Sequence, residues 1–213
     1  MKNKIIVALD TDNLDKAKKL VKLLRPRIKF FKIGLELINT GKAPELIKFI
    51  DKLGARVFYD IKLNDIPNTI ARSVKVISKL GVWGFTIHAS SGREAIRAAV
   101  ARKGKSKVIG VTILTSLPAD KNKIVRLAGM LAEEGADGIV CSVREIKLLK
   151  KFEKLIIAPG IRPAWASQND QRRTATPRKA MEAGADYLVI GRPITEHKDP
   201  LEALESIMKE MEK

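Results

Sequence analysis

KIIVALDTDNLDKAKKLVKLLRPRIKFFKIG, residues 4–34, contains one complete unit of a pattern that repeats along this chain. Short apolar runs rich in β-branched and aromatic residues lie at its two ends, at residues 4–9 and 28–33. Between them, apolar residues recur at spacings of three and four from Leu14 to Leu24, which is typical of a helix with one buried face. The stretch therefore predicts a strand, a helix and a second strand.

The same alternation continues to the end of the chain, with one strand and helix unit about every 25 residues. Eight strand candidates result, at residues 4–9, 28–33, 57–59, 84–88, 108–114, 138–141, 155–158 and 187–190. Strands that alternate with helices form parallel sheets, and eight such units favour closure into a barrel. We therefore predict an α/β fold, a (β/α)8 TIM barrel that spans residues 1–213 as one domain. An open doubly wound sheet is less favoured, because Asp10, Thr11 and Asp12 follow the first strand in place of a glycine-rich turn.

Length and composition limit the possible classes of protein. With 213 residues, of which 45% are hydrophobic, the chain can bury one substantial core. No apolar stretch approaches the roughly 20 residues that a membrane helix requires, so we expect a cytoplasmic protein without a membrane partner. The single cysteine, Cys141, follows three residues without charge or polar side chains, which predicts core packing and excludes an internal disulfide.

The formal net charge of +17 raises the question of a nucleic-acid partner. Lysine and arginine are spread over nearly every predicted helix and are interleaved with acidic residues, and only 5% of residues are aromatic. A nucleic-acid surface generally combines a contiguous basic patch with aromatic rings on which bases stack. We therefore predict solvated helix faces, no nucleic-acid partner, and a positive field that attracts a phosphorylated small molecule.

The connections between the predicted elements carry two signals. Gly54, Gly81, Gly135 and Gly184 each lie between a predicted helix and the next strand, where glycine relieves a left-handed conformation at a helix end. The connection at residues 159–176, after the seventh strand, is unusually long, and long loops in compact domains are usually functional. In a barrel, this loop would lie on the face where active sites form.

The strongest chemical signal is the segment FYDIKLNDIPNT, residues 58–69. Asp60 and Lys62 leave the third strand two residues apart, and such side chains on an extended strand point to the same side. Asp65 follows at or near the start of the next helix, and Lys32 is at the end of the neighbouring strand. We predict that these two carboxylates and two ammonium groups share a small volume. Ion pairs at the barrel mouth are the structural alternative, but perturbed charges concentrate at functional sites.

Two other residues at strand ends allow more than one interpretation. Asp10 either contributes to the site or caps the first helix. His88 is better explained as a hydrogen-bonding residue than as a metal ligand. No set of histidine, cysteine and aspartate has the spacing of a zinc site. A divalent ion held by Asp10 and Asp60 would have to compete with the lysines beside them, so we predict no metal.

A phosphate site is predicted where the last two strands end. Gly160 and Arg162 follow the seventh strand, and Gly191 and Arg192 follow the eighth. Barrels commonly bind phosphate with the loops at these two positions, and guanidinium groups suit a dianion. Arg192 alone could be a surface residue, but its pairing with Arg162 on the neighbouring loop favours the phosphate site.

These segments resemble those of the orotidine 5'-phosphate decarboxylase family, and the resemblance runs almost from end to end. Its most specific part is the string D-x-K-x-x-D-I-x-x-T at residues 60–69. The other matching segments, in the order of the family, are VALD (7–10), FKIG (31–34), TIHA (86–89), VTILTS (111–116), APGIRP (158–163), NDQRR (169–173) and VIGRPI (189–194). The resemblance implies conversion of orotidine 5'-monophosphate (OMP) to uridine 5'-monophosphate (UMP) in pyrimidine biosynthesis, without a cofactor.

The same resemblance implies roles for individual residues. Lys62 corresponds to the proton donor to C6 of the pyrimidine, Asp60 to the carboxylate set against the substrate's carboxylate, and Lys32 completes the charged network. Asp65 resembles the aspartate that reaches the site of the neighbouring subunit, which implies a homodimer. Substrate contacts are implied for Asp10 and Thr69 at the ribose, Thr115 or Ser116 at the pyrimidine, Arg162, Gln171, Gly191 and Arg192 at the phosphate, and also for Lys32, Ile66 and Pro159. Gln171 is preferred to Gln168 because it lies in the Asp-Gln-Arg-Arg segment.

Three other functions are less favoured. Magnesium-dependent sugar-phosphate decarboxylases and hexulose-phosphate synthases resemble this chain in the D-x-K-x-x-D core, but they generally have an acidic residue where Lys32 stands. A nucleic-acid-binding module would leave the motifs of the site unexplained. A barrel that only binds nucleotides is a third possibility, but every residue expected to do chemistry is present.

Overall fold

Eight parallel strands form a closed barrel in the computed structural model of this protein, which describes residues 4–118, 120–166 and 174–212. The strands are β1 (Ile5–Ala8), β2 (Phe30–Ile33), β3 (Arg56–Leu63), β4 (Gly84–His88), β5 (Lys107–Val111), β6 (Gly138–Val140), β7 (Leu155–Ala158) and β8 (Tyr187–Ile190). Each strand pairs with the next one along the chain, and β8 pairs with β1. The predicted (β/α)8 barrel is confirmed, and the open doubly wound sheet is wrong.

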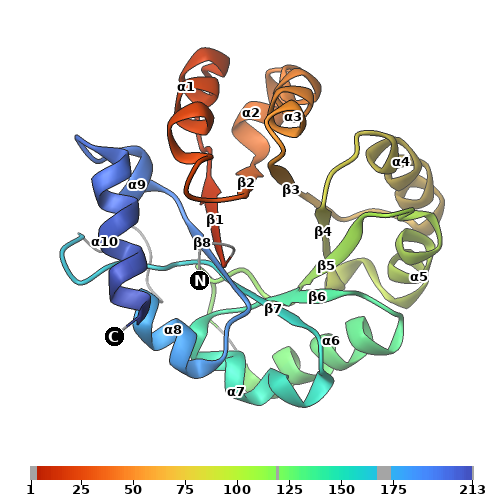
Figure 1. The fold of residues 1–213 in the computed structure, drawn as a ribbon. Helices are drawn as coiled ribbons and strands as arrows, with labels where there is room; N and C mark the ends of the chain where they lie inside the picture. The colour runs from red at the N-terminus through yellow and green to blue at the C-terminus, as the bar shows by residue number, and fades with distance from the viewer. Residues whose placement is uncertain (1–3, 119, 167–173, 213) are drawn as a thin grey trace.

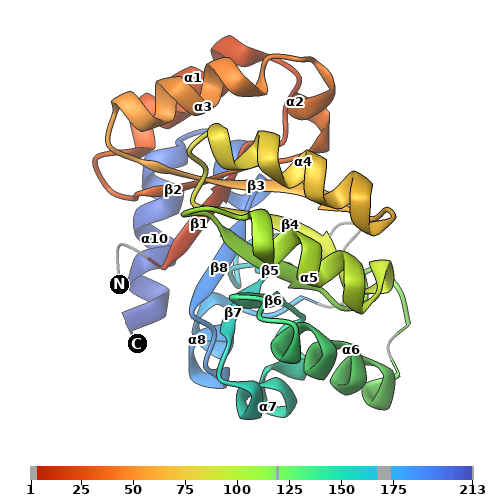
Figure 2. The same ribbon diagram turned by 90° about the vertical axis from the view of Figure 1, so that its right-hand side faces the viewer.

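Helices follow the strands and form a ring around the barrel (Figure 1). The α-helices are α1 (Leu14–Leu24), α2 (Leu35–Asn39), α3 (Ala43–Lys52), α4 (Pro67–Lys79), α5 (Arg93–Arg102), α6 (Lys121–Glu133), α7 (Ile146–Leu149), α8 (Pro177–Ala183), α9 (Arg192–Thr195) and α10 (Pro200–Glu212). Short 3-10 helices are present at η1 (Ala89–Ser91), η2 (Val143–Glu145) and η3 (Lys150–Phe152). In Figure 2, α4 and α5 lie side by side on the outer wall.

The glycines predicted to end helices have the backbone conformation that this role requires. Their φ angles are positive, at 68° for Gly54, 72° for Gly81, 85° for Gly135 and 100° for Gly184. A residue with a Cβ atom is disfavoured in this region, and glycine is not. These four positions therefore mark turns from a helix into the next strand, as predicted.

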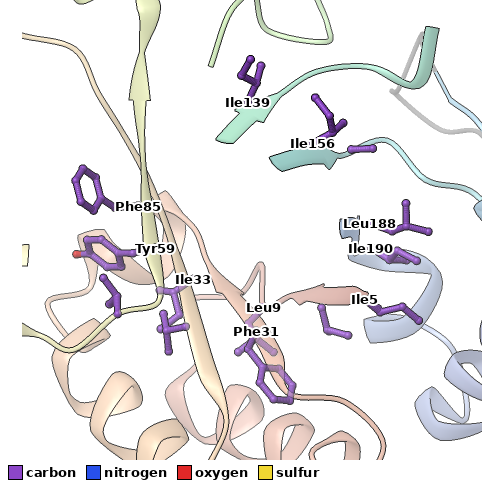
Figure 3. Close-up of a cluster of buried hydrophobic side chains, with 14 of the residues drawn as sticks. Ile5, Leu9, Phe31, Ile33, Tyr59, Phe85, Ile139, Ile156, Leu188 and Ile190 are labelled. Carbon is purple, nitrogen blue, oxygen red and sulfur yellow. The ribbon is translucent and has the colours of Figure 1, made fainter. Parts of the chain in front are cut away.

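Alternate residues of a strand face two different cores. In β1, Ile5 and Val7 belong to the large core between the barrel and its helices, whereas Ile6 and Ala8 belong to a smaller core inside the barrel. Figure 3 shows part of the larger core, including Phe31. Because side chains alternate along a strand, this pattern decides which residues point into the barrel.

Aromatic side chains fill the amino-terminal end of the barrel interior. The ring of Trp83, just before β4, lies 5.1 Å from the ring of Phe30 and 5.1 Å from that of Tyr187, both in edge-to-face geometry. Phe30 and Tyr187 are the first residues of their strands, so this packing closes one end of the barrel. The opposite end, where the strands finish, is left for polar groups.

Two predicted strand ends differ clearly from the structure. The fifth strand was expected to reach Leu114 but finishes at Val111, and the third was expected to finish at Tyr59 but continues to Leu63. An apolar run indicates which residues are buried and not which ones form hydrogen bonds between strands. The run after Val111 therefore made the predicted fifth strand too long. In the second case the strand continues through charged residues, which an apolar pattern does not detect.

Cys141 is buried directly after β6, and burial raises the pKa of its thiol. A thiol of this kind stays protonated, in agreement with the predicted packing role. Among the described residues, no helix is both long enough and apolar enough to cross a membrane.

Candidate active site

A cavity of about 220 Å³ opens where the strands end. Part of its wall is apolar and comes from the barrel interior, for example Ala8, Phe58 and Val189. The remaining wall contains most of the residues that the sequence predicted for a site, namely Asp10, Lys32, Asp60, Lys62, Thr115, Pro159, Arg162, Gly191 and Arg192. The barrel therefore brings them together on the face where active sites of this fold form.

The alternation of side chains along the strands explains why charged residues enter this cavity. Phe30 in β2 faces the barrel interior, so Lys32, two residues later, points the same way. Asp60 follows Phe58 in β3 by the same spacing. Asp10 lies two residues beyond the end of β1, and β1 is the strand that pairs with β2 on its other side from β3. Three adjacent strands thus each contribute at least one charged group to the same volume.

Lys32 is held between two carboxylates, and only 12% of its side chain is exposed. Its Nζ lies 2.8 Å from Oδ1 of Asp10 and 3.6 Å from Oδ2 of Asp60. Burial by itself lowers the pKa of Lys32, but the two carboxylates outweigh burial and raise this pKa above its ordinary value. The helix-cap alternative for Asp10 is wrong, because Asn13 caps α1 and accepts a hydrogen bond from the amide of Lys16 at 2.9 Å.

Asp60 lies between the two ammonium groups. Its Oδ2 is 2.8 Å from Nζ of Lys62 and 3.6 Å from Nζ of Lys32, and its Oδ1 accepts a hydrogen bond from Oγ1 of Thr86 at 3.0 Å. Burial raises the pKa of Asp60, but the two lysines and the hydrogen bonds outweigh burial and lower this pKa below its ordinary value. Asp60 is therefore ionised at neutral pH. Together with Asp10, these residues form a row of alternating charges.

Lys62 has an unexpected backbone conformation. Lys62 belongs to β3, but its backbone is not extended, because its φ angle is 52°, in the left-handed region that residues with a Cβ atom rarely adopt. The register of β3 against β4 shifts between Tyr59 and Leu63, which indicates a β-bulge. The amide of Lys62 donates to the hydroxyl of Thr86 at 2.8 Å. The side chains of Asp60 and Lys62 still meet, but the bulge and not a simple alternation brings them together.

Thr86 is a residue of this site that was not predicted. Its side chain is fully buried in β4, and its hydroxyl contacts both Asp60 and Lys62. Its neighbours Phe85 and Ile87 belong to the outer core, so Thr86 points into the barrel. The sequence did contain a signal for this residue, namely a threonine at an inward-facing position of an otherwise apolar strand. A buried hydroxyl requires a hydrogen-bond partner, so such a threonine indicates polar groups nearby.

The two arginines predicted to bind phosphate, Arg162 and Arg192, lie in the same cavity wall as Gly191. Arg162 is only 6% exposed. Its amide donates to the carbonyl oxygen of Ala175 at 2.9 Å, which joins the two ends of the long connection at 159–176. Arg162 thus places a guanidinium group in the cavity wall, a group whose planar fork of donors suits a phosphate or carboxylate anion.

Three predicted residues at the start of α4 do not line the cavity of their own chain. Asp65, Ile66 and Thr69 are all exposed, and Ile66 has 66% of its surface in contact with solvent. The Oδ1 atom of Asp65 accepts a hydrogen bond from the amide of Ile66 at 2.7 Å. All three therefore remain accessible from outside this chain.

The remaining predicted residues are at the other loops. Thr115 lines the cavity, whereas Ser116 is exposed and does not, which favours Thr115 as the contact to the ligand. Gln171 and its alternative Gln168 lie outside the described residues. No structural statement about the contribution of either glutamine follows.

His88, the last residue of β4, lies near the charged group. Burial and the charge of Lys62 lower the pKa of His88 and outweigh the opposite effect of Asp60, so its imidazole is neutral at pH 7. No group of three or more histidine, cysteine, aspartate or glutamate residues in the described ranges is placed to hold a metal ion.

The geometry limits the chemistry that this cavity can perform. Lys62 is an ammonium group with 32% of its side chain exposed, next to an ionised carboxylate, and it can deliver a proton to a bound ligand. Guanidinium groups in another part of the same wall suit a phosphate group. The arrangement therefore fits a phosphorylated substrate on which negative charge develops during the reaction.

Comparisons with known proteins agree with this arrangement. The sequence model of the "Orotidine 5'-phosphate decarboxylase / HUMPS family" matches residues 3–207. An orotidine 5'-phosphate decarboxylase of Syntrophomonas wolfei is 39% identical over 98% of this chain and 98% of its own length, and one of Shewanella sediminis is 43% identical over 97% of each. The crystal structure of orotidine 5'-phosphate decarboxylase from Lactobacillus acidophilus is similar with a TM-score of 0.84 and 33% identity, over 99% of this chain and 100% of that chain.

Proposed function

Because this chain belongs to the orotidine 5'-phosphate decarboxylase / HUMPS family, we propose that its cavity converts OMP to UMP and carbon dioxide, as a carboxy-lyase of pyrimidine biosynthesis. The observation that carries this proposal is the row of charges in which Lys32 and Lys62 lie on either side of Asp60 inside the cavity. Relatives named for this activity match almost the whole chain, so the similarity includes both the barrel and the loops that carry the site.

The chemical difficulty of the reaction is the charge that develops on the pyrimidine ring. The bond between C6 and the carboxylate carbon breaks, carbon dioxide leaves, and the electron pair stays on C6. In our proposal the ammonium group of Lys62 lies beside C6, stabilises this charge and transfers a proton to form the C6–H bond of UMP. The resulting neutral amine regains its proton from water.

Asp60 has two effects in this proposal. Its carboxylate is 2.8 Å from Nζ of Lys62 and holds that group in place by an ion pair until the proton is transferred. The same carboxylate would face the carboxylate of OMP and repel it, and this repulsion is relieved when carbon dioxide leaves. Lys32 lies between Asp10 and Asp60, and its positive charge offsets part of the negative charge of these two carboxylates and of the substrate.

The phosphate group of OMP supplies binding energy at a distance from the reacting atoms. Arg162 and Arg192 carry the two positive charges that suit this dianion, and Gly191 allows backbone to approach it closely. Gln171 remains a predicted phosphate contact from the long connection. Remote binding of this kind orients the pyrimidine against Lys62 and lowers the barrier of the chemical step.

A magnesium-dependent sugar-phosphate enzyme is the alternative within the same family. The cation position between Asp10 and Asp60 is already taken by the ammonium group of Lys32, at 2.8 Å and 3.6 Å. A divalent ion would have to displace or neutralise this lysine, so the donor set favours metal-independent chemistry. The cytoplasmic location and the absence of a nucleic-acid partner stay predictions.

A direct assay tests the function. The absorbance change on conversion of OMP to UMP is followed with purified protein in excess EDTA, with Lys62→Ala in parallel. We expect turnover that EDTA does not affect and that Lys62→Ala abolishes. Lys103→Ala is the matched control, because Lys103 forms a similarly enclosed ion pair with Asp137 at 2.7 Å that is not in the cavity wall. Turnover that requires magnesium and a sugar phosphate would establish the alternative.

We also propose that the enzyme is a homodimer in which Asp65 completes the cavity of the partner. Asp65 is exposed and is outside the wall of its own cavity, and the neighbouring Ile66 presents an apolar side chain to solvent. The two subunits of a symmetric dimer would then exchange equivalent residues.

Mixing two inactive variants tests this dimer. Lys62→Ala and Asp65→Asn lack different residues, so a mixed dimer contains one site with both changes and one with neither. Random exchange of equal amounts should restore about one quarter of the wild-type activity, since half of the dimers are mixed and each has one intact site. No recovery after exchange, with dimers present by light scattering, would show that Asp65 acts within its own subunit or not at all.

A further inference from the structure

Thr86 lies opposite the irregular part of β3. On either side of the register shift, the paired residues of β3 and β4 are Tyr59 with Phe85 and Leu63 with Ile87. Three residues of β3, 60–62, therefore lie opposite one residue of β4, which is Thr86. A bulge leaves its extra residues outside the regular ladder of backbone hydrogen bonds. Here the side chain of Thr86 takes the place of a ladder partner, because the amide of Lys62 donates to its Oγ1 at 2.8 Å.

The chemistry of the three groups decides the direction of both hydrogen bonds. A backbone amide only donates, and an ionised carboxylate only accepts. The hydroxyl of Thr86 therefore accepts from the amide of Lys62 and donates its single proton to Oδ1 of Asp60, at 3.0 Å. Thr86 is 0% exposed, so bulk water does not compete for either bond. One hydroxyl thus connects the backbone of Lys62 to the carboxylate beside its ammonium group.

The backbone of Lys62 depends on such a contact. Its φ angle of 52° is unfavourable for a residue with a Cβ atom, and conformations of this kind persist only where the surrounding structure holds them. Without the hydroxyl, the amide of Lys62 and Oδ1 of Asp60 would both lose a hydrogen-bond partner, and only the ion pairs at Oδ2 would hold the Asp60 carboxylate. Both changes would move Nζ of Lys62 relative to a bound ligand.

We propose that Thr86 is a positioning residue for the decarboxylation, whose hydroxyl holds Lys62 in its bulged conformation and fixes Asp60 beside it. This inference rests on the proposed function and adds to it a residue that does not line the cavity. The hydroxyl forms its hydrogen bonds of 2.8 Å and 3.0 Å with two residues of the row of alternating charges, Lys62 and Asp60. Its loss should therefore reduce kcat much more than it changes the KM for OMP.

Thr86→Val tests the proposal, because valine has nearly the same shape and lacks the hydroxyl. A hydrogen bond to a charged group contributes enough that we expect kcat to fall about 10- to 100-fold, with KM changed less than about threefold. Thr86→Ser restores the hydroxyl and should recover kcat to within about threefold of wild type. Thermal unfolding of each variant establishes that the comparison is made on folded protein.

Thr112→Val is the matched control. Thr112 is buried directly after β5, it is not in the cavity wall, and its hydroxyl has no hydrogen-bond partner among the described residues. Removal of this hydroxyl should leave kcat unchanged. If replacing any buried threonine near the barrel mouth lowered kcat, Thr112→Val would lose activity as Thr86→Val does.

Three results would overturn the proposal: wild-type kcat in Thr86→Val, equal losses in Thr86→Val and Thr86→Ser, or a rise in KM without a fall in kcat. If Thr86→Val does not fold, Thr86→Ala and Thr86→Ser are compared instead, and equal kcat values in those two overturn it. Wild-type protein that does not convert OMP would contradict the proposed function itself. Active wild-type protein with a fully active Thr86→Val variant would contradict only the role of Thr86.

Discussion

Asp60→Asn removes one negative charge from the centre of the site while it keeps the shape of the side chain. At an effective dielectric constant of about 20, unit charges 2.8 Å and 3.6 Å apart attract each other by about 6 and about 5 kcal/mol. The cost of taking these charges out of water offsets most of this attraction. Because 32% of the Lys62 side chain stays exposed, we expect the free energy of unfolding to fall by about 3 kcal/mol, at the lower end for a broken buried pair.

This loss should be visible as a decrease in Tm of about 6 to 12 °C, measured by calorimetry at pH 7. It should also depend on pH in a defined direction. The pKa of Asp60 is lowered in the folded protein from its ordinary value of 3.8, so its contribution is present above that value and is lost as the pH falls through the lowered pKa. The stability difference between wild type and Asp60→Asn should therefore shrink below about pH 4.

Catalysis should fall further than stability alone explains. Loss of one preorganised charge at a reacting centre typically reduces kcat about 100- to 1,000-fold, which the OMP assay measures at a temperature where the variant is folded. Asp137→Asn is the control, because Asp137 also pairs with a lysine, Lys103, and also accepts a second hydrogen bond, from the amide of Val108 at 2.8 Å. Asp137→Asn should lose stability and keep kcat. Asp60→Asn with kcat within about threefold of wild type would refute the electrostatic argument.

Three further predictions concern Lys32, Gly34 and Arg192. Lys32→Met should destabilise the protein at pH 8. Its stability difference from wild type should disappear as the pH rises through the pKa of Lys32, which lies above the ordinary value of 10.5. Denaturant titrations over this pH range measure the difference, and a difference that stays constant would contradict the raised pKa of Lys32. Gly34→Ala should lower kcat, because its Cβ atom would lie 3.0 Å from Nζ of Lys32 and 3.1 Å from Oδ1 of Asp10; unchanged kcat would show that this pair need not stay in place. Arg192→Ala should raise the KM for OMP about 10- to 100-fold, and it should leave unchanged the slow turnover of orotidine, which lacks the phosphate group.

The order of strands and helices could be predicted from the sequence because it depends on local patterns. A strand buried on both faces needs a short apolar run, and the crossover to the next parallel strand needs an amphipathic helix. Both features lie within about 25 residues of one another, and glycines such as Gly54 and Gly184 mark the turns between them. The charged residues at the strand ends were equally visible, since a closed barrel brings all strand ends to one face.

The detailed geometry of the site could not be predicted in this way, because it depends on how neighbouring strands are aligned. Thr86 contacts Lys62 and Asp60 across 24 and 26 residues of sequence, and its role depends on a register shift that no local pattern marks. The left-handed backbone of Lys62 belongs to the same bulge. The sequence by itself determined which chemical groups the barrel mouth contains and in which order the strands deliver them. Only the tertiary structure decided which atoms meet, because distances of 2.8 Å or 3.6 Å between charges depend on strand register and side-chain packing, and these form only when the barrel closes.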